Sequence, residues 1–253
     1  MHEGTNLPHF ASFAAVPAAS GVMTRARRAL LDLLFPPRCV ICRQTGSAFC
    51  PACLSRVQPA QEEAPSDPET AGSVRLSGIR SAGLYRPPLS LAIREFKYRR
   101  RTDLAASLSG LMAHTWQSSG VGVDLVAAVP LHEKRLAERG YNQAELLAVE
   151  FCRAVKLPHL SPGLLARQKS TEHQVGLGLQ ERRRNVEGAF VWNGPPLQGA
   201  TVLLIDDVAT TGSTLDACAE ALLQAGAGAL WALTAARAVV KSGHDRLADG
   251  PIP

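Results

Sequence analysis

The sequence has no run of apolar residues long enough for a membrane-spanning helix, which needs about 18 or more. It also lacks basic residues ahead of its first apolar stretch, because Arg25, Arg27 and Arg28 come after that stretch. This order argues against a secretory signal. We expect residues 1–22 to form a disordered tail, with Met23 as an alternative start of translation. Together these features predict a cytoplasmic protein without a transmembrane segment.

Two common nucleotide-binding motifs are missing as well. No segment ends in the Gly-Lys-Ser/Thr of a P-loop, and none has the three spaced glycines of a dinucleotide-binding loop. There is no internal repeat. The net charge of +5 and the pI near 9.1 favour anionic ligands, without distinguishing a small phosphate compound from a nucleic acid. At 253 residues, 46% of them apolar, the chain can form one large or two smaller globular domains.

The most informative stretch that is present runs from Val202 to Thr214. Four apolar residues, 202–205, predict a buried strand, and two carboxylates, Asp206 and Asp207, follow it. A short loop then leads into a helix that Ser213 can cap, with an acid three residues further on. Unpaired N–H groups at a helix start suit a phosphate, and adjacent acids suit a sugar diol or a Mg²⁺-bound group. The alternative is an ordinary strand, turn and capped helix.

Four cysteines form a second pattern in the N-terminal part. Two Cys-x-x-Cys pairs follow each other closely, which supplies the four thiolates that a closed tetrahedral zinc site needs. Disulfides would need an oxidising compartment, and a redox motif would need one pair beside a βαβ unit. We therefore predict a structural zinc site at Cys39, Cys42, Cys50 and Cys53. The remaining two, Cys152 and Cys218, are expected to be buried apolar residues.

Between the cysteines and the phosphate motif, predicted strands alternate with predicted helices, which indicates a mostly parallel sheet covered on both faces. Residues 58–73 carry four acids and three prolines but no Lys or Arg, a composition typical of a linker. The predicted organisation is a tail (1–22), a zinc module (23–57), an acidic Pro-rich linker (58–76), an α/β domain (77–240) and a C-terminal tail (241–253).

The stretch from Val202 to Thr214 resembles the phosphoribosyl-pyrophosphate (PRPP) signature of type I phosphoribosyltransferases. With a four-cysteine module preceded by Leu-Leu-Phe-Pro, the chain resembles the ComF family of competence-associated proteins, from about Leu30 to about Ala236. The resemblance implies a type I phosphoribosyltransferase-like α/β fold behind a small zinc-ribbon-like module. It also implies that Asp206 and Asp207 hold the ribose hydroxyls. The phosphate-binding residues would be Ala209, Thr210, Thr211, Gly212, Ser213 and Thr214.

Two further segments match the family pattern. A strand-end loop around Pro130 and Leu131 is followed by Arg139-Gly-Tyr-Asn-Gln143, in the place where type I enzymes bind pyrophosphate. A polar, glycine-bearing segment between two predicted strands matches their mobile hood. The resemblance implies PRPP contacts from Arg139, Asn142, Gln143, Gln174 and Asn185, and a catalytic role for Arg182 beside the acid pair. The alternative for the first segment is a solvated basic helix face, and for the second an ordinary surface loop and helix.

Two functions follow from these patterns. The first is a PRPP-binding phosphoribosyltransferase-like protein that uses Mg²⁺ with PRPP, with an unidentified acceptor and a role in DNA uptake or nucleotide salvage. The second is an accessory protein that handles single-stranded DNA, in which PRPP only regulates and the competence-helicase machinery is a partner. Residues 96–101, Phe-Lys-Tyr-Arg-Arg-Arg, favour the second function because they interleave aromatic and basic side chains. They are also typical of a helix that ends in basic residues. Lys97 and Tyr98 match a position of the family pattern.

Overall fold

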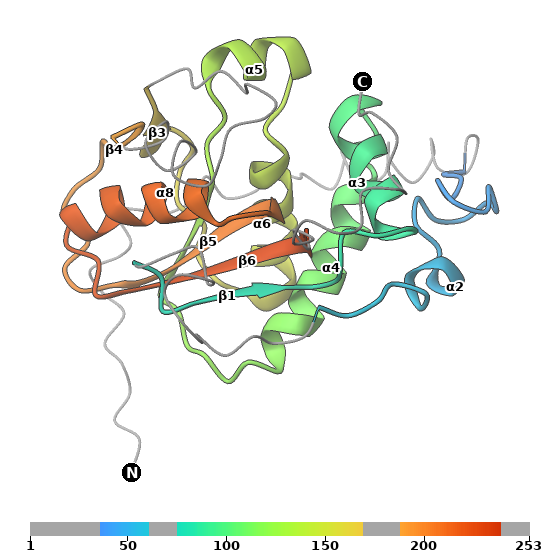
Figure 1. Cartoon of the computed structure of the whole chain (residues 1–253), viewed down its shortest axis with the longest axis horizontal. Helices are drawn as coiled ribbons and strands as arrows, with labels where there is room; N and C mark the ends of the chain where they lie inside the picture. Colours follow the sequence, from blue (N-terminus) through green and yellow to red (C-terminus); the bar gives the residue numbers. More distant parts are fainter. Residues whose placement is uncertain (1–35, 61–74, 169–187, 239–253) are drawn as a thin grey trace, which may run out of the picture.

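The computed structural model describes residues 36–60, 75–168 and 188–238 (Figure 1). Within these residues, strands and helices alternate along most of the chain, as the sequence predicts. The predicted tails, most of the predicted linker and most of the hood segment lie outside the described residues. So does the short apolar segment that precedes the first cysteine.

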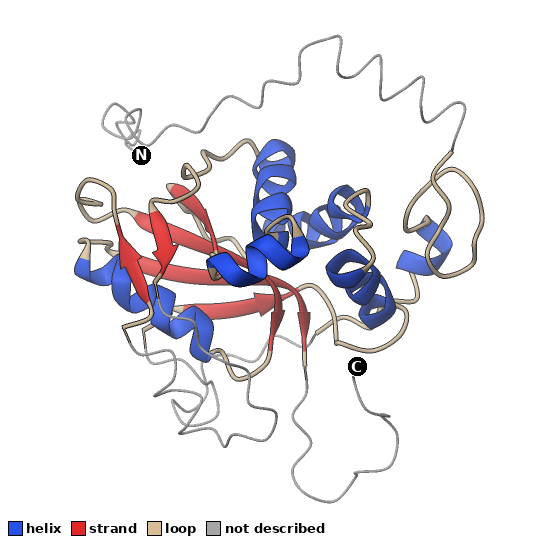
Figure 2. Ribbon diagram, turned by 90° about the horizontal axis from the view of Figure 1, so that it is seen from above, coloured by secondary structure: helices blue, strands red, loops and turns tan. Residues whose placement is uncertain are grey.

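The centre of the molecule is a four-stranded parallel sheet (Figures 1 and 2). Its order is β1-β6-β5-β2, so the two longest strands lie in the middle. The strands are β1 (Gly78–Ser81), β2 (Leu125–Ala128), β5 (Thr201–Ala209) and β6 (Ala229–Arg237). Neighbouring strands are parallel throughout, with Ala128 opposite Ile205 and Ile205 opposite Leu233. The parallel sheet predicted from the alternating elements is confirmed.

Apolar side chains on the two faces of the sheet belong to two separate core clusters. Leu203 and Ile205 pack into a cluster with α3 (Leu89–Tyr98), α4 (Leu104–Gln117) and α6 (Gln143–Val155). Val202 and Leu204 pack into the other with α8 (Ser213–Gln224) and with the antiparallel pair β3 (Leu165–Arg167) and β4 (Phe190–Trp192). Because side chains alternate along a strand, β5 supplies both clusters.

Helix α6 forms where the apolar pattern predicts it. Ala144, Leu147, Ala148 and Phe151 recur at helical spacing, and all four are buried. Asn142 caps the helix by accepting a hydrogen bond from the backbone N–H of Ala144, and the helix ends where Lys156 adopts a left-handed conformation. This helix covers the sheet beside the loop that leaves β2.

The four-cysteine module, with its short helix α2 (Pro51–Leu54), packs against the α/β domain. Phe49 is 1% exposed and belongs to the same core cluster as Leu89 and Phe96 of α3. The backbone N–H of Leu84 also donates to the carbonyl oxygen of Gln58 at 2.8 Å. A module of this size buries little apolar surface by itself, so metal binding supplies much of its folding free energy. Since its apolar side chains share the core of α3 and α4, packing stabilises it as well.

In the part of the chain that the structure describes, no helix has both the length and the apolar character needed to cross a bilayer.

Candidate functional site

The two candidate acids lie within β5 rather than beyond its end. The sequence predicted a strand over 202–205 with the acids following it, but β5 continues to Ala209. The reason is non-local: Asp206 pairs with Thr234 and Val208 with Ala236 of β6. On the other side, β2 pairs with β5 only as far as Ile205. The acids therefore begin where the sheet opens on the β2 side.

The acids also face different sides of the sheet. Strand alternation places Asp207 on the face of Leu203 and Ile205, where α3 packs, and Asp206 on the face of α8. The backbone N–H of Asp207 donates to Oδ1 of Asp206 at 2.8 Å, which fixes the orientation of that carboxylate. The two carboxylates are therefore adjacent in sequence but sit in different surroundings.

Lys97, at the end of α3, pairs with one of the two acids. Its Nζ atom lies 2.8 Å from Oδ1 of Asp207, and both side chains are largely buried. Burial by itself lowers the pKa of the Lys97 ammonium. The charge of Asp207 and its hydrogen bond, with a smaller contribution from Asp206, outweigh burial and raise that pKa above its ordinary value. Lys97 is therefore a fixed positive charge at the acid pair.

Among the described residues, no cationic side chain forms an ion pair with Asp206 in the way that Lys97 does with Asp207. Burial raises the pKa of its carboxyl to about 7, and the charge of Asp207 adds to the rise. Lys97, the backbone N–H of Asp207 and Arg167 oppose this rise without cancelling it. At neutral pH the acid pair therefore takes up a proton, a cation or a hydrogen-bond donor readily.

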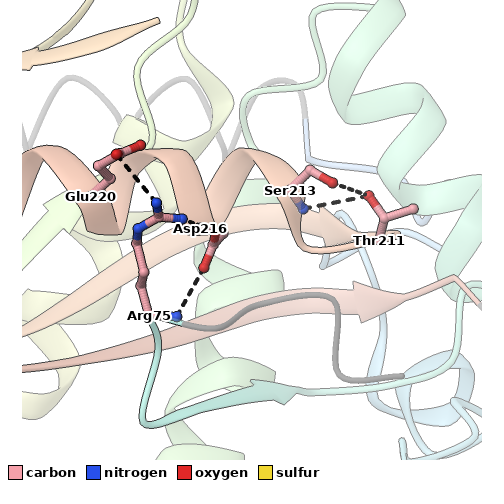
Figure 3. A network of polar contacts seen from close by, with 5 residues as sticks. All are labelled: Arg75, Thr211, Ser213, Asp216 and Glu220. Atoms are coloured by element: carbon pink, nitrogen blue, oxygen red, sulfur yellow. Dashed lines mark hydrogen bonds and ion pairs between the residues drawn. The ribbon is translucent and has the colours of Figure 1, made fainter. Parts of the chain in front are cut away.

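The loop after β5 is short and enters α8 through a glycine. Gly212 has φ of 76° and is the N-cap residue, a conformation that favours glycine. The predicted cap by Ser213 is wrong, because Ser213 is already the first helical residue. Instead, the Thr211 hydroxyl shares a 2.8 Å hydrogen bond with the Ser213 hydroxyl and accepts from the Ser213 N–H at 3.4 Å (Figure 3). Thr210 is exposed at the tip, and Thr214 is half-buried.

The acid predicted to complete the cap has a different partner. Asp216 accepts hydrogen bonds from the backbone N–H of Arg75, at 3.0 Å, and from its guanidinium, at 2.6 Å. The same guanidinium donates to Glu220 one turn further along α8 (Figure 3). These contacts attach the chain that enters β1 to the helix whose first turn forms the candidate phosphate site.

The strand-end loop after β2 contains the helix α5 (Glu133–Arg139), in agreement with the alternative of a basic helix face. Pro130 and Leu131 are half-buried in the connection before it. Asn142 is engaged within the chain, because its side-chain amide also donates to the carbonyl oxygen of Val129. The Arg139 guanidinium donates to Oε1 of Gln143 and lies 5.4 Å from the centroid of the Tyr98 ring.

Gln143 is only 1% exposed, and its amide nitrogen has no hydrogen-bond partner among the described residues. The structure thus brings Arg139 and Gln143 together with the end of α3. Three predicted hood residues, Gln174, Arg182 and Asn185, lie outside the described residues. Arg167, where that segment begins, lies over the ring of Phe190.

The four cysteines of the N-terminal module converge as predicted. The sulfur atoms of Cys39, Cys42, Cys50 and Cys53 all lie within 4.8 Å of one another. Zinc–sulfur bonds of about 2.3 Å place tetrahedral sulfurs about 3.8 Å apart, so the four thiols fit a zinc ion with little movement. Burial opposes ionisation of Cys39 and Cys53, yet backbone N–H groups lower the pKa of Cys39 to about 6, whereas burial and the other thiols raise the pKa of Cys53 to about 12. A divalent cation would relieve this conflict.

Lys97 is a site residue that the sequence did not connect with the acid pair. Its signals were a match to a family position and its place between two aromatic residues at a predicted helix end. Its partner lies in a distant part of the chain, so no local pattern could pair them. Phe96, by contrast, was a candidate for base stacking, and it is fully buried.

Comparisons with known proteins give the following similarities. Residues 30–65 match the double zinc ribbon domain family. The chain is 32% identical over 215 residues to the DNA utilization protein YhgH of Escherichia coli O157:H7, covering 82% of this chain and 87% of that protein. It is 34% identical over 153 residues to competence protein F of Haemophilus influenzae, covering 57% of this chain and 66% of that protein.

Among solved structures, a purine phosphoribosyltransferase from Pyrococcus horikoshii is similar, with 13% identity and a TM-score of 0.31. The alignment covers 57% of this chain and 92% of that one. Similarity at this level does not identify a ligand. The match to the YhgH protein extends over most of both chains. The chain therefore belongs to the ComF family of competence and DNA utilization proteins.

Proposed function

We propose that the chain binds PRPP at the carboxyl end of β5 and acts as a phosphoribosyltransferase-like protein. The observation that carries the proposal is the continuous order of the acids on β5, a loop of hydroxyl residues, Gly212 and the start of α8. Ligands of parallel α/β sheets bind outside the carboxyl ends of the strands. The acids of this chain are at that edge.

Each part of PRPP has a complementary partner there. The N–H groups of the first turn of α8 suit the 5-phosphate, and the left-handed Gly212 allows close approach of the backbone. The carboxylates of Asp206 and Asp207 suit the ribose hydroxyls, which donate hydrogen bonds. Arg139, held by Gln143 near the end of α3, offers a positive charge for the pyrophosphate.

Mg²⁺ fits this arrangement as a companion of the pyrophosphate. The acid pair carries more negative charge than Lys97 neutralises, and hard cations prefer carboxylate and phosphate oxygens. When bound, the ion would stabilise charge on the departing pyrophosphate. The chain's own residues would hold the ribose and orient its C1 carbon toward an acceptor.

The names of the relatives, competence protein F and DNA utilization protein, support a place for this activity in DNA uptake, with nucleotide salvage as the other process that we consider. The acceptor would be a metabolite of that process. In the reaction, a nucleophilic atom of the acceptor would form a bond to the ribose C1 carbon, and pyrophosphate would leave from that carbon. We place the protein in the cytoplasm, where reducing conditions keep four zinc-binding thiols available.

The proposal is tested by calorimetry of PRPP with Mg²⁺, using the native protein and the double variant Asp206→Ala/Asp207→Ala. We expect binding by the native protein and a loss of at least about tenfold in the variant, because both ribose contacts are removed. Glu150→Ala is the control, since this acid pairs with Arg153 on the outer face of α6. Equal affinity in the native protein and the double variant would contradict the proposal.

A second candidate function is the handling of single-stranded DNA. Tyr98 is 60% exposed, with the guanidinium of Arg139 over its ring, and Arg94, Arg99 and Arg100 are exposed nearby on or just after α3. An exposed ring among cations can stack a base and bind its phosphates. This surface is smaller than the sequence predicted, because Phe96 is buried and Arg101 is paired with Asp103.

The two functions can be separated by measuring binding of a single-stranded oligonucleotide over a salt series. DNA binding through this surface should weaken steeply with salt and should fall in Tyr98→Ala, which leaves the acid pair intact. No binding at low salt would remove the second function. PRPP binding that is unchanged in Tyr98→Ala would show that the two sites are independent.

A further inference from the structure

The pairing of Lys97 with Asp207 joins two distant parts of the chain at the proposed PRPP site. Lys97 is the second-last residue of α3, and Asp207 lies in the last part of β5. The distance between Nζ and Oδ1 is 2.8 Å, and the side chains are 21% and 10% exposed. Such a pair is shielded from solvent, so removal of one partner leaves a poorly solvated charge. The pairing therefore has a larger energetic effect than an exposed salt bridge.

Helix α3 holds the lysine in place from several sides. Leu89, Ala92, Ile93 and Phe96 are fully buried in a core cluster that also contains Phe49 and Cys53 of the cysteine module. The Tyr141 hydroxyl donates to the carbonyl oxygen of Phe96, the residue before Lys97. The backbone that carries Lys97 is therefore fixed by the domain core, by the zinc module and by the turn before α6.

The surroundings of the two acids differ in a way that matters for a ribose. Lys97 occupies one oxygen of Asp207 and fixes the direction of its carboxylate, while Asp206 is oriented by a backbone N–H. Two neighbouring carboxylates also repel each other, and a fixed cation offsets that repulsion. Tyr85 lies within electrostatic range of both Lys97 and Asp207, and Tyr98 lies within range of Lys97.

We infer that Lys97 is a positioning residue of this site: it holds the Asp207 carboxylate in the geometry that accepts a ribose hydroxyl. The inference rests on the proposed PRPP function and extends it to a helix that the phosphoribosyl motif does not include. Lys97 acts through Asp207 and does not itself contact the sugar. Because α3 packs against the cysteine module, the same helix connects the zinc site with the acid pair.

The first test needs no ligand. A double-mutant cycle of Lys97→Met and Asp207→Asn is measured by chemical unfolding. Each single variant should be destabilised, and the double variant should be more stable than the sum of the two effects predicts, because removal of both charges leaves neither unpaired. Additive effects would show that the two side chains do not interact and would overturn the inference.

The second test measures PRPP affinity with Mg²⁺ by calorimetry. Lys97→Met should lose about tenfold or more, whereas Lys97→Arg, which keeps the charge, should regain most of the affinity. Arg94→Met, an exposed cation on the same helix, is the control and should bind within about twofold of the native protein. Native affinity in Lys97→Met would overturn the inference.

The two tests also distinguish the inference from the function on which it rests. If the native protein does not bind PRPP, the proposed function fails, and the ligand-free cycle still decides whether Lys97 positions Asp207. If the native protein binds PRPP and the cycle is additive, the function stands and the inference fails.

Discussion

The guanidinium of Arg101 donates a hydrogen bond to the backbone carbonyl oxygen of Arg38, with a distance of 2.9 Å. The same guanidinium pairs with Asp103, just before α4. This contact attaches the residue before the first cysteine to the α/β domain. Together with the core that Phe49 shares with α3, it makes the cysteine module part of one cooperative structure.

Removal of zinc should therefore destabilise the whole described chain and not the module alone. We expect a chelator, or the variant Cys53→Ser, to lower the midpoint of thermal unfolding of the complete protein, because metal binding supplies folding free energy. The measurement is thermal unfolding followed by circular dichroism, together with metal analysis. Cys152→Ala is the control, since Cys152 is buried in the same cluster but lies outside the metal group. An unfolding midpoint that does not depend on zinc would contradict this account.

A second prediction concerns the dependence of stability on pH. Burial raises the pKa of Glu145 to about 7 and lowers that of His159 to about 4, so the two groups do not form an ion pair at neutral pH although they lie 3.6 Å apart. The folded state binds a proton on Glu145 more tightly than the unfolded state does. Stability is therefore lost as the pH rises from the unfolded value, near 4.5, through about 7.

Glu145→Gln removes this loss. We expect the variant to gain about 1–2 kcal/mol in free energy of unfolding at about pH 8, and less at about pH 5. Urea unfolding at the two pH values measures the difference. The control is Glu150→Gln on the same helix, whose carboxylate pairs with Arg153. A gain that is larger at the lower pH would contradict the assigned protonation.

A third prediction compares two glycines. A Cβ atom on Gly228, just before β6, would lie 2.3 Å from the carbonyl oxygen of Gly199, so Gly228→Ala must shift the backbone. We expect a loss of about 2 kcal/mol or more in the free energy of unfolding. Gly110 lies on the exposed side of α4 with no atom within 4 Å of a new Cβ. Gly110→Ala should gain about 0.5–1 kcal/mol, because alanine favours the helix. Chemical unfolding of both variants provides the comparison, and a stable Gly228→Ala protein would disprove the contact.

The sequence predicted the alternating elements, the cysteine group and the buried face of α6, because each depends on a local pattern. For Ala144 and Phe151, the helical spacing of the apolar residues is sufficient to predict that they are buried. The extension of β5 through Val208 was not predictable, since it depends on pairing with Ala236 in a distant strand. Helix α5 also has local signals, an acid in its first turn and Gly140 at its end, and a basic helix face was one of the two interpretations of this segment.

In the candidate site, too, the features that depend on a local pattern were predictable, and those that depend on contacts between distant segments were not. The acids, the loop and Gly212 are contiguous, so one motif identifies them. Lys97 reaches the site only because α3 packs across the sheet edge, which no local pattern reveals. The cap of α8 was misassigned because Thr211 and Ser213 are two hydroxyl residues with a single residue between them, and the left-handed Gly212 places the helix start after Thr211.

The central claim is that the edge of the sheet formed by β5 and α8 recognises a phosphorylated ribose carrying pyrophosphate. The most direct test is a calorimetric titration of the native, zinc-loaded protein with PRPP in the presence of Mg²⁺, compared with ribose 5-phosphate under the same conditions. The account predicts saturable binding of PRPP that is at least about tenfold tighter than that of ribose 5-phosphate, because only PRPP engages Arg139 and its neighbours. No binding of PRPP, or equal affinity for the two compounds, would contradict it.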